Sequence, residues 1–529
     1  MPLQREDSSL NTTLGKFVAN IGYGGIRGGV LLANTLVLTP ILISRLGRDQ
    51  FAILALVTPF LRYGFNGVFD LGLATGLVRF LSRDFASGDH ASINRYCTSS
   101  FWLYVTAGAS LLVLYQLASP SLLHSLLGLD VRLYVTAQTA LRQFLWIYAI
   151  LLLSNPFFAL LMGVQKVHLS HVVGTVSLLI ELIGILVLVP LGITLSRVVF
   201  VYAVGAIVCA LLCVILAYYH FPHLRLRLQS VSGRSILDLA HYTTRWSVTV
   251  STSLLAPVID KLILARFVGL SYVAIYEPAA KLIEILKRAT QLLLLPIFPL
   301  AGAAVANQTK EQRQAFYQRV FGANLVLSAG LYLIPMTVIF GIMRIWLGPE
   351  LSGPAGWAFV VLSSTGFMLA LVTPAALILA GTGRMRLLVT TGLTALSLNL
   401  FLSSILAKHL GFRGLLAGTA LAYVGQSLLI LVGLQRWKEF TLNVRSFIRM
   451  GLVVVCGAVV PGLVLVAIFG REPGAAKLVA LGAVEIAIYC AALFTFEDNR
   501  KLAVIVTMHG RKIVGAWLVR RRTGQISQG

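Results

Sequence analysis

Long apolar stretches recur along almost the whole chain, from residue 14 to residue 496. A helix needs about 20 apolar residues to cross roughly 30 Å of hydrocarbon, and each stretch meets that length. The gaps between them are too short to hold a soluble domain. Only 12% of the 529 residues are charged, about half of what a soluble domain carries. The pattern therefore predicts an all-α polytopic membrane protein of about 14 transmembrane helices.

The ends of these helices are set by Gly, Pro and charged residues, which interrupt the apolar stretches. The first seven helices are predicted at 14–43, 51–80, 98–118, 135–163, 168–190, 195–219 and 243–267. The second seven are predicted at 271–304, 315–346, 354–380, 385–407, 413–435, 446–469 and 475–496.

The basic residues give the chain a formal charge of +24 and gather in the short loops between the predicted helices. Their bias toward alternate loops predicts that both termini are cytoplasmic. This placement indicates attraction to anionic membrane lipids and no nucleic-acid binding. The tail at 497–529 contains VIVTMHGRKIVGAWLV between basic residues, which predicts an amphipathic helix on the membrane surface.

The chain offers no pattern that is typical of a metal site or of a catalytic centre. Its five cysteines form no CxxC pair, so we expect buried thiols and neither a disulfide framework nor a metal site. The N-terminus lacks a basic segment followed by a short apolar core, so we expect no cleaved signal. No GxxxxGK[ST] loop occurs, and we expect no cofactor, no catalytic residue and no enzymatic activity.

The sequence contains an internal repeat, a feature that in transporters often places the substrate between two halves. NPFFALLMGVQKVHLSHVVG from Asn155 aligns without gaps on TPAALILAGTGRMRLLVTTG from Thr373. The pairs matched at an offset of 218 are Pro156 and Pro374, Gly163 and Gly381, and Gly174 and Gly392. Similar offsets relate Gly192 to Gly411, at 219, and LGRDQFAI from Leu46 to VGLSYVAI from Val268, at 222.

This spacing maps the first six predicted helices onto the next six. Because each unit has an even number of helices, both units cross the membrane in the same direction and the repeats are parallel. We therefore expect two six-helix bundles around a central cavity, at 1–220 and 221–440. Two C-terminal helices at 441–496 and a basic cytoplasmic tail at 497–529 follow them.

Several charged residues lie deep within the predicted helices, where each costs about 2.5–3.5 kcal/mol. They include Arg27, Arg62, Arg142, Asp260 and Lys261. On the helix at 271–304, charges in steps of four, three and four residues share one face; they are Glu277, Lys281, Glu284 and Arg288. Pairing at i, i+4 contributes only about 0.2–0.5 kcal/mol, so this polar stripe is predicted to line a hydrated cavity.

Bases outnumber acids among the deep residues, and the cavity is predicted to be cationic. Arginine suits phosphate because its guanidinium forms two parallel hydrogen bonds with it. We therefore predict a binding site for an anionic substrate at Arg27, Arg62, Lys261, Lys281, Glu284 and Arg288. The alternative is that these residues only join helices through ion pairs.

Several runs of the sequence resemble one transporter family. LTPILISRLGRDQFAILALVTPF and YGFNGVFDLGLATGLVRFLSR, with a GD before the third helix, resemble the start of the polysaccharide-exporter branch of the multidrug/oligosaccharidyl-lipid/polysaccharide exporter (MOP) superfamily, which includes O-antigen flippases. DKLILARFVGLSYVAIYEPAAKL, LLLPIFPLAG and GTGRMRL in the second repeat are similar to later segments of that family. The resemblance covers most of the chain.

The resemblance implies a flippase for polysaccharide export. Such a protein moves an undecaprenyl-diphosphate-linked oligosaccharide from the cytoplasmic to the periplasmic leaflet of a bacterial inner membrane by alternating access. Its transport is coupled either to a gradient of an ion such as H⁺ or Na⁺ or to the membrane potential. A related lipid II flippase uses cationic residues on helices 1 and 8, to which Arg27, Lys281 and Arg288 are comparable by helix and depth. We expect a functional monomer that works near glycan polymerase and glycosyltransferases.

Three other functions stay open from the sequence. A drug or cation antiporter of the same superfamily would need a cavity dominated by acids and aromatics, which the excess of bases disfavours. A membrane glycan polymerase or transferase would need a larger outer loop than the longest one predicted, around residues 119–134. A scaffold without transport activity would leave the buried charges unexplained.

Overall fold

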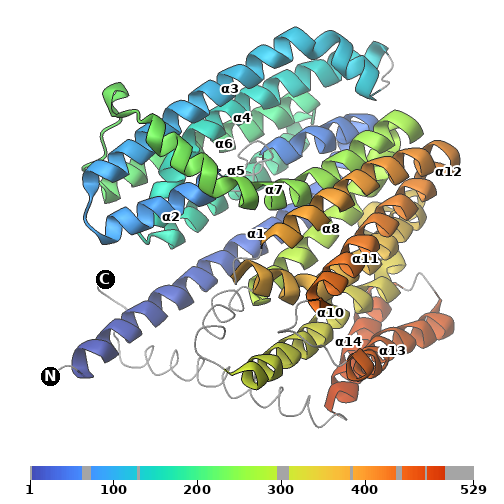
Figure 1. Ribbon diagram of the computed structural model, residues 1–529. Helices are drawn as coiled ribbons and strands as arrows, with labels where there is room; N and C mark the ends of the chain where they lie inside the picture. Colours follow the sequence, from blue (N-terminus) through green and yellow to red (C-terminus); the bar gives the residue numbers. More distant parts are fainter. Residues whose placement is uncertain are drawn as a thin grey trace. The chain divides into compact units, whose positions relative to one another are not determined.

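The computed structural model describes residues 3–61, 73–127, 131–294, 309–381, 385–436, 444–470 and 474–494, and all regular structure within them is helical (Figure 1). Three predicted features lie outside the described residues: Arg62, the surface helix of the tail at 497–529, and parts of the predicted helices at 51–80 and 271–304.

The helices follow the predicted order. Those of the first repeat are α1 Leu3–Val57, α2 Leu73–Ala86, α3 His90–Leu127, α4 Val131–Gly163, α5 Val167–Leu191 and α6 Leu195–His220. The later ones are α7 Gly233–Ile263, α8 Leu270–Leu294, α10 Lys310–Leu347, α11 Pro349–Gly381, α12 Met385–Gln435, α13 Val444–Phe469 and α14 Ala475–Phe494. Short helical turns occupy Thr58–Leu61, Leu228–Ser230 and Leu264–Val268.

Large apolar side chains face outward on many of these helices. Phe200 and Ile215 on α6 are more than 60% exposed, which in water would be unfavourable and in lipid is expected. Among the described residues, eight helices are long and apolar enough to cross a membrane. The prediction of an all-α polytopic membrane protein is therefore confirmed.

The internal repeat is visible in the lengths of the helices. Both α3 and α10 have 38 residues, and they begin at His90 and Lys310. Both α4 and α11 have 33 residues and end at the matched glycines Gly163 and Gly381. An offset near 220 residues therefore relates whole helices as well as single positions.

Matched glycines also interrupt the chain at equivalent points. Gly47 within α1 and Gly269 before α8 have φ angles of 77° and 131°. Gly192 after α5 and Gly411 within α12 have φ angles of 86° and 60°. Because side chains other than glycine rarely adopt positive φ, these residues mark where one transmembrane helix turns into the next. The sequence predicted loops at 44–50 and 408–412, and the structure instead turns sharply at single glycines.

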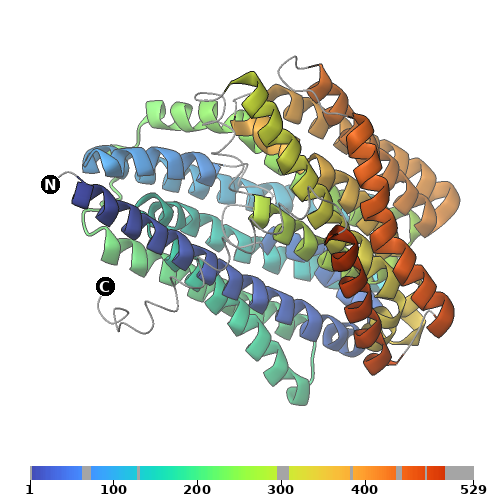
Figure 2. The ribbon, with the colours of Figure 1, turned by 90° about the horizontal axis from the view of Figure 1, so that it is seen from below.

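Contacts divide the chain into two compact units. The first contains residues 1–281 and 385–422; within it α4 packs against α2, α3 and α6, and α1 packs against α5 (Figure 1). The second contains residues 282–384 and 423–529; within it α10 packs against α11, α13 and α14. The red helices α13 and α14 lie beside each other in Figure 2.

The segment between α6 and α7, which connects the two repeats, is fastened to α3. Asn94 Nδ2 donates a hydrogen bond to the carbonyl oxygen of His223, and its Oδ1 accepts one from the Arg225 amide, both at 2.9 Å. Asp89 caps α3 by accepting hydrogen bonds from Ser92 N and Oγ. These hydrogen bonds hold the pKa of Asp89 below its ordinary value.

Candidate functional site

Two charged residues follow each other on α7, Asp260 and Lys261, and both are buried. Successive residues of an α-helix point about 100° apart, so the two side chains enter different surroundings. Lys261 joins an ionic group with α8, whereas Asp260 joins a hydrogen-bonded group with α8 and α12.

The ionic group contains two lysines and one carboxylate. Lys261 Nζ lies 2.6 Å from Glu277 Oε2 and donates a hydrogen bond to the carbonyl oxygen of Ala55 at 2.9 Å. Lys281 Nζ lies 3.9 Å from Glu277 Oε1 and 5.6 Å from the centre of the Phe51 ring. The structure therefore brings two of the predicted site residues together around a shared counter-charge.

Burial distinguishes the two lysines of this group. The side chains of Lys261 and Glu277 are each 5% exposed, whereas that of Lys281 is 32% exposed. A buried ion pair has lost most of its hydration, and its members are held by mutual attraction in a low dielectric. The group carries two positive charges and one negative charge, and Lys281 is its accessible ammonium.

The second group surrounds Asp260 with neutral donors. Its Oδ1 accepts hydrogen bonds from Asn399 Nδ2 at 2.9 Å and from Thr419 Oγ1 at 3.2 Å, and its Oδ2 accepts one from the Tyr276 hydroxyl at 2.7 Å. Ser403 Oγ donates to Asn399 Oδ1 at 2.7 Å and extends the group. Within the described residues Asp260 forms no ion pair. A buried carboxylate without a cationic partner is costly when ionised, so the group has the chemistry to take up a proton or a small cation.

Arg27 lies at the contact between α1 and α5. A Cβ atom added at Gly174 would lie 2.7 Å from both Cζ and Nε of Arg27, so the glycine makes room for the guanidinium. One turn earlier on α1, a Cβ atom added at Gly24 would lie 3.7 Å from the ring of His171. Arg27 itself is half-buried. This predicted site residue is thus positioned by the close approach of α1 to α5.

Glu284 and Arg288 form an ion pair on the part of α8 that belongs to the second unit. Arg288 Nη2 and Nε lie 2.8 Å and 3.2 Å from Glu284 Oε1. An exposed i, i+4 pair contributes only about 0.3–0.5 kcal/mol. Because Arg288 is 45% exposed, it can exchange Glu284 for another anion at little cost. Arg62, the remaining predicted ligand, lies outside the described residues.

The second unit contains one further buried acid. Glu485 on α14 is fully buried, and its Oε2 accepts a hydrogen bond from Thr337 Oγ1 on α10 at 2.7 Å. Gly462 on α13 lies against both residues, and a Cβ atom there would collide with them. The acid thus sits where three helices meet.

The partners of Asp260 on α12 were missed by the sequence reasoning. Asn399, Ser403 and Thr419 are not among the residues that the sequence singled out. Asn399 and Ser403 are four residues apart and therefore lie on the same face of the helix, which indicates a polar contact on that face. Polar side chains within membrane helices usually bond across to another helix, so a partner for Asn399 was to be expected.

Comparisons with known proteins agree with this architecture. Residues 31–187 match the MatE family model. A multidrug resistance MATE family transporter of the MOP superfamily, solved in an inward-facing conformation, aligns with a TM-score of 0.67 and 16% identity over 77% of this chain and 98% of that chain. The lipid II flippase MurJ, in an inward closed conformation, aligns with a TM-score of 0.69 and 11% identity over 90% of this chain and 98% of that chain. The chain shares the fold of these two proteins.

An outward-facing MATE family transporter also aligns, with a TM-score of 0.56 and 15% identity over 80% of this chain and 95% of that chain. No curated protein sequence matches the chain significantly. Within this fold, the two buried groups described above are built from α7, α8, α12 and the last turn of α1.

Proposed function

We propose that the protein is a flippase for an undecaprenyl-diphosphate-linked oligosaccharide, acting by alternating access for polysaccharide export. In this proposal the chain spans a bacterial inner membrane with both termini cytoplasmic and works as a monomer. The observation that carries the proposal is the ammonium of Lys281, whose side chain is 32% exposed beside the buried pair of Lys261 and Glu277. An accessible cation in a membrane helix favours an anionic substrate.

The diphosphate is the part of the substrate that suits this chemistry. Lysine binds phosphate as a point charge, and arginine binds it through two parallel hydrogen bonds. Lys281 and Arg288 are two accessible cations of α8, and Arg27 adds a guanidinium from α1. We propose that these three hold the diphosphate, that Lys261 fixes Glu277 behind Lys281, and that Arg62 and Glu284 complete the site.

The two repeats supply the proposed motion. Bundles at 1–220 and 221–440 would rock about the central cavity, while the segment at 441–496 accompanies them. MurJ is named as a flippase of lipid II, a precedent within this fold for a lipid-linked anionic substrate. The glycan is proposed to occupy the hydrated interior while the lipid chain stays in the bilayer.

Asp260 is proposed to couple the motion to a cation gradient. Its two oxygens accept three hydrogen bonds from neutral groups, and the carboxylate is fully enclosed. Uptake of H⁺ or Na⁺ would neutralise the buried charge, and its release would restore it. Coupling requires that the cation bind more tightly to one conformation of the transporter than to the other. We propose that the surroundings of Asp260 provide this difference.

A drug or cation antiporter is the second candidate, because residues 31–187 match the MatE family and MATE transporters share the fold. The two functions require cargo of opposite charge. Purified protein in vesicles should move a fluorescent lipid-linked oligosaccharide diphosphate between leaflets and should not accumulate a cationic dye such as ethidium. Accumulation of ethidium without movement of the oligosaccharide would overturn the proposed function.

A further inference from the structure

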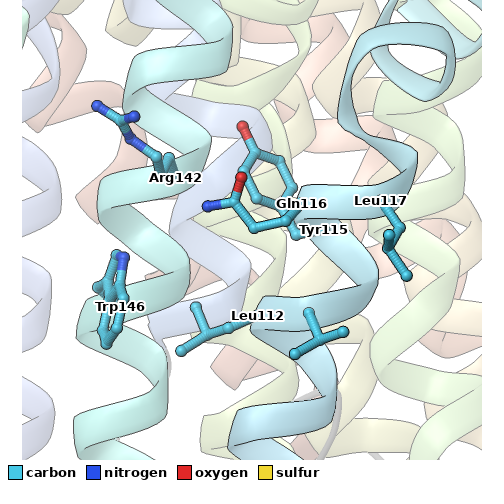
Figure 3. Close-up of a pocket in the computed structure, with 7 residues that line it drawn as sticks. Leu112, Tyr115, Gln116, Leu117, Arg142 and Trp146 are labelled. Carbon is cyan, nitrogen blue, oxygen red and sulfur yellow. The ribbon is translucent and has the colours of Figure 1, made fainter.

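A groove runs between α3 and α4 on the surface of the first unit (Figure 3). Its volume is about 210 Å³. The residues that line it are Leu112, Val113, Tyr115, Gln116 and Leu117 of α3 and Arg142 and Trp146 of α4. Val113 and Leu117 are 56% and 77% exposed, so the groove opens to the surroundings of the protein.

Three polar groups on this groove have no partner among the residues that the structure describes. They are the guanidinium of Arg142, the amide of Gln116 and the indole N–H of Trp146. In Figure 3 Arg142 and Trp146 lie one turn apart on α4, and Gln116 points toward α4 from the facing helix. The hydroxyl of Tyr115 is instead used within the protein, because it donates to the carbonyl oxygen of Gln138 at 2.9 Å.

The positions of these groups along their helices set their depth in the membrane. Gln116 follows the exposed Arg95 by 21 residues on α3, and Arg142 precedes the end of α4 at Gly163 by 21 residues. Both intervals correspond to about 31 Å of helix, roughly the thickness of the hydrocarbon. Placing Arg95 and Gly163 at one membrane surface puts Gln116 and Arg142 at the headgroups of the opposite leaflet, where Arg142 is shallower than the sequence predicted.

A second surface groove provides an internal contrast. It runs along α5, has a volume of about 350 Å³, and is lined by Val176, Leu179, Ile180, Ile183 and Gly184 alone. Such a surface accepts hydrocarbon chains without regard to their headgroups. The groove between α3 and α4 combines a similar apolar wall with a charged guanidinium at headgroup depth.

We propose that the groove between α3 and α4 is a binding site for an anionic phospholipid, distinct from the proposed substrate site. The phosphate accepts hydrogen bonds from Arg142, in the geometry that guanidinium and phosphate share. Gln116 and Trp146 donate to the glycerol and ester oxygens, and an acyl chain lies along Leu112, Val113 and Leu117. Trp146 suits this position because its ring is apolar and its N–H is polar.

Native mass spectrometry of the purified full-length protein tests the site. The probes are phosphatidylglycerol and phosphatidylethanolamine with identical acyl chains, and inorganic phosphate serves as a headgroup without a chain. Arg142→Gln is expected to weaken phosphatidylglycerol binding about five-fold. It should weaken phosphatidylethanolamine binding less, because that headgroup has no net charge, and inorganic phosphate should not compete.

Arg413→Gln is the matched control, because Arg413 is an exposed arginine of α12 that lies outside both grooves. It should bind phosphatidylglycerol like the wild type. Equal phosphatidylglycerol binding by the Arg142→Gln and Arg413→Gln variants would overturn the proposal, as would effective competition by inorganic phosphate.

Two further measurements apply if Arg142→Gln fails to fold. Arg142→Lys keeps the charge and should keep the preference for phosphatidylglycerol over phosphatidylethanolamine. In the wild type, phosphatidylglycerol with brominated chains should quench tryptophan fluorescence more than brominated phosphatidylethanolamine does. The Trp146→Phe variant should show no such difference between the two lipids. An unchanged difference in the Trp146→Phe variant would contradict the site.

Discussion

The segments 46–57 and 268–279 occupy equivalent places in the two repeats. Their backbones are similar, but their buried side chains differ. Each begins at a glycine with positive φ and continues as a helix. At the same register, the first repeat has Ala55 and the second has Glu277. Lys261 links the two positions, because it contacts both the carbonyl oxygen of Ala55 and the carboxylate of Glu277.

The matched helices α5 and α12 differ in a similar way. At the offset of 218 that relates Gly174 to Gly392, Glu181 of α5 corresponds to Asn399 of α12. In the second repeat the acid lies instead on α7, as Asp260, and Asn399 donates to it. Glycines that shape the backbone are thus duplicated, whereas the charged residues of the candidate site are particular to one repeat. We therefore expect the matched positions to serve the structure and the unmatched ones to serve function.

The largest expected effect comes from Glu277→Gln, which removes the counter-charge that only the second repeat contains. Lys261 would then be buried without a counter-charge, at a cost of about 3–5 kcal/mol. Thermal unfolding in detergent measures the loss. The double variant Lys261→Met with Glu277→Leu should recover most of it, since an apolar pair replaces a buried ion pair at little cost. A Glu277→Gln variant as stable as the wild type would show that the pair is not enclosed.

The next effect concerns the duplicated backbone. Gly47→Ala and Gly269→Ala each place a side chain in a region of φ and ψ that glycine alone adopts readily, at about 1–3 kcal/mol. Open space surrounds Gly47, so the cost there arises from the backbone and not from collision. Both variants should lower the midpoint of thermal unfolding by similar amounts. A lower unfolding midpoint in only one of the two variants would show that the two junctions are not equivalent.

Asp260→Asn is expected to change coupling more than stability. The amide keeps the shape of the carboxylate and removes its charge, so destabilisation should stay near 1 kcal/mol. Transport in vesicles should then respond no longer to an imposed H⁺ or Na⁺ gradient. Asn324→Ser, which removes a buried amide bonded to the carbonyl oxygen of Ala370 in the second unit, serves as a control and should keep the gradient dependence. A gradient response retained by the Asp260→Asn variant would exclude the coupling role.

The smallest effect is expected at the matched glycines of α5 and α12. Gly392→Ala brings a Cβ atom to 3.0 Å from Thr252 Oγ1, and Gly174→Ala brings one to 2.7 Å from the flexible end of Arg27. The gain in helix propensity, about 1 kcal/mol, should offset most of either contact. Unfolding midpoints should therefore shift little for both, whereas transport should fall only for Gly174→Ala, because Arg27 is displaced. Equal transport by the two variants would show that Arg27 does not bind the substrate.

The fold was largely predictable from the sequence because its signals are local. Apolar length predicts helices that cross a membrane, and matched residues such as Gly163 and Gly381 fix the repeat. The abrupt turns at Gly47 and Gly411 were not predicted, since a glycine in an apolar stretch does not reveal its φ angle.

The candidate site was only partly predictable, because burial depends on contacts between distant segments. The sequence placed Lys261 and Lys281 in one set but gave no way to distinguish the enclosed lysine from the accessible one. The bond between Asp260 and Asn399 joins residues 139 positions apart. No periodicity within one helix encodes such a partner.

The most direct test of the account is the initial rate at which a fluorescent lipid-linked oligosaccharide diphosphate changes leaflet in vesicles that contain the Lys281→Gln variant. The rate is expected to fall about ten-fold or more, since a charge-assisted contact to phosphate is lost. Lys281→Arg should retain most of the rate, and Lys408→Gln, at an exposed lysine of α12, should match the wild type. A wild-type rate for the correctly folded Lys281→Gln variant would contradict the claim that this ammonium holds the diphosphate.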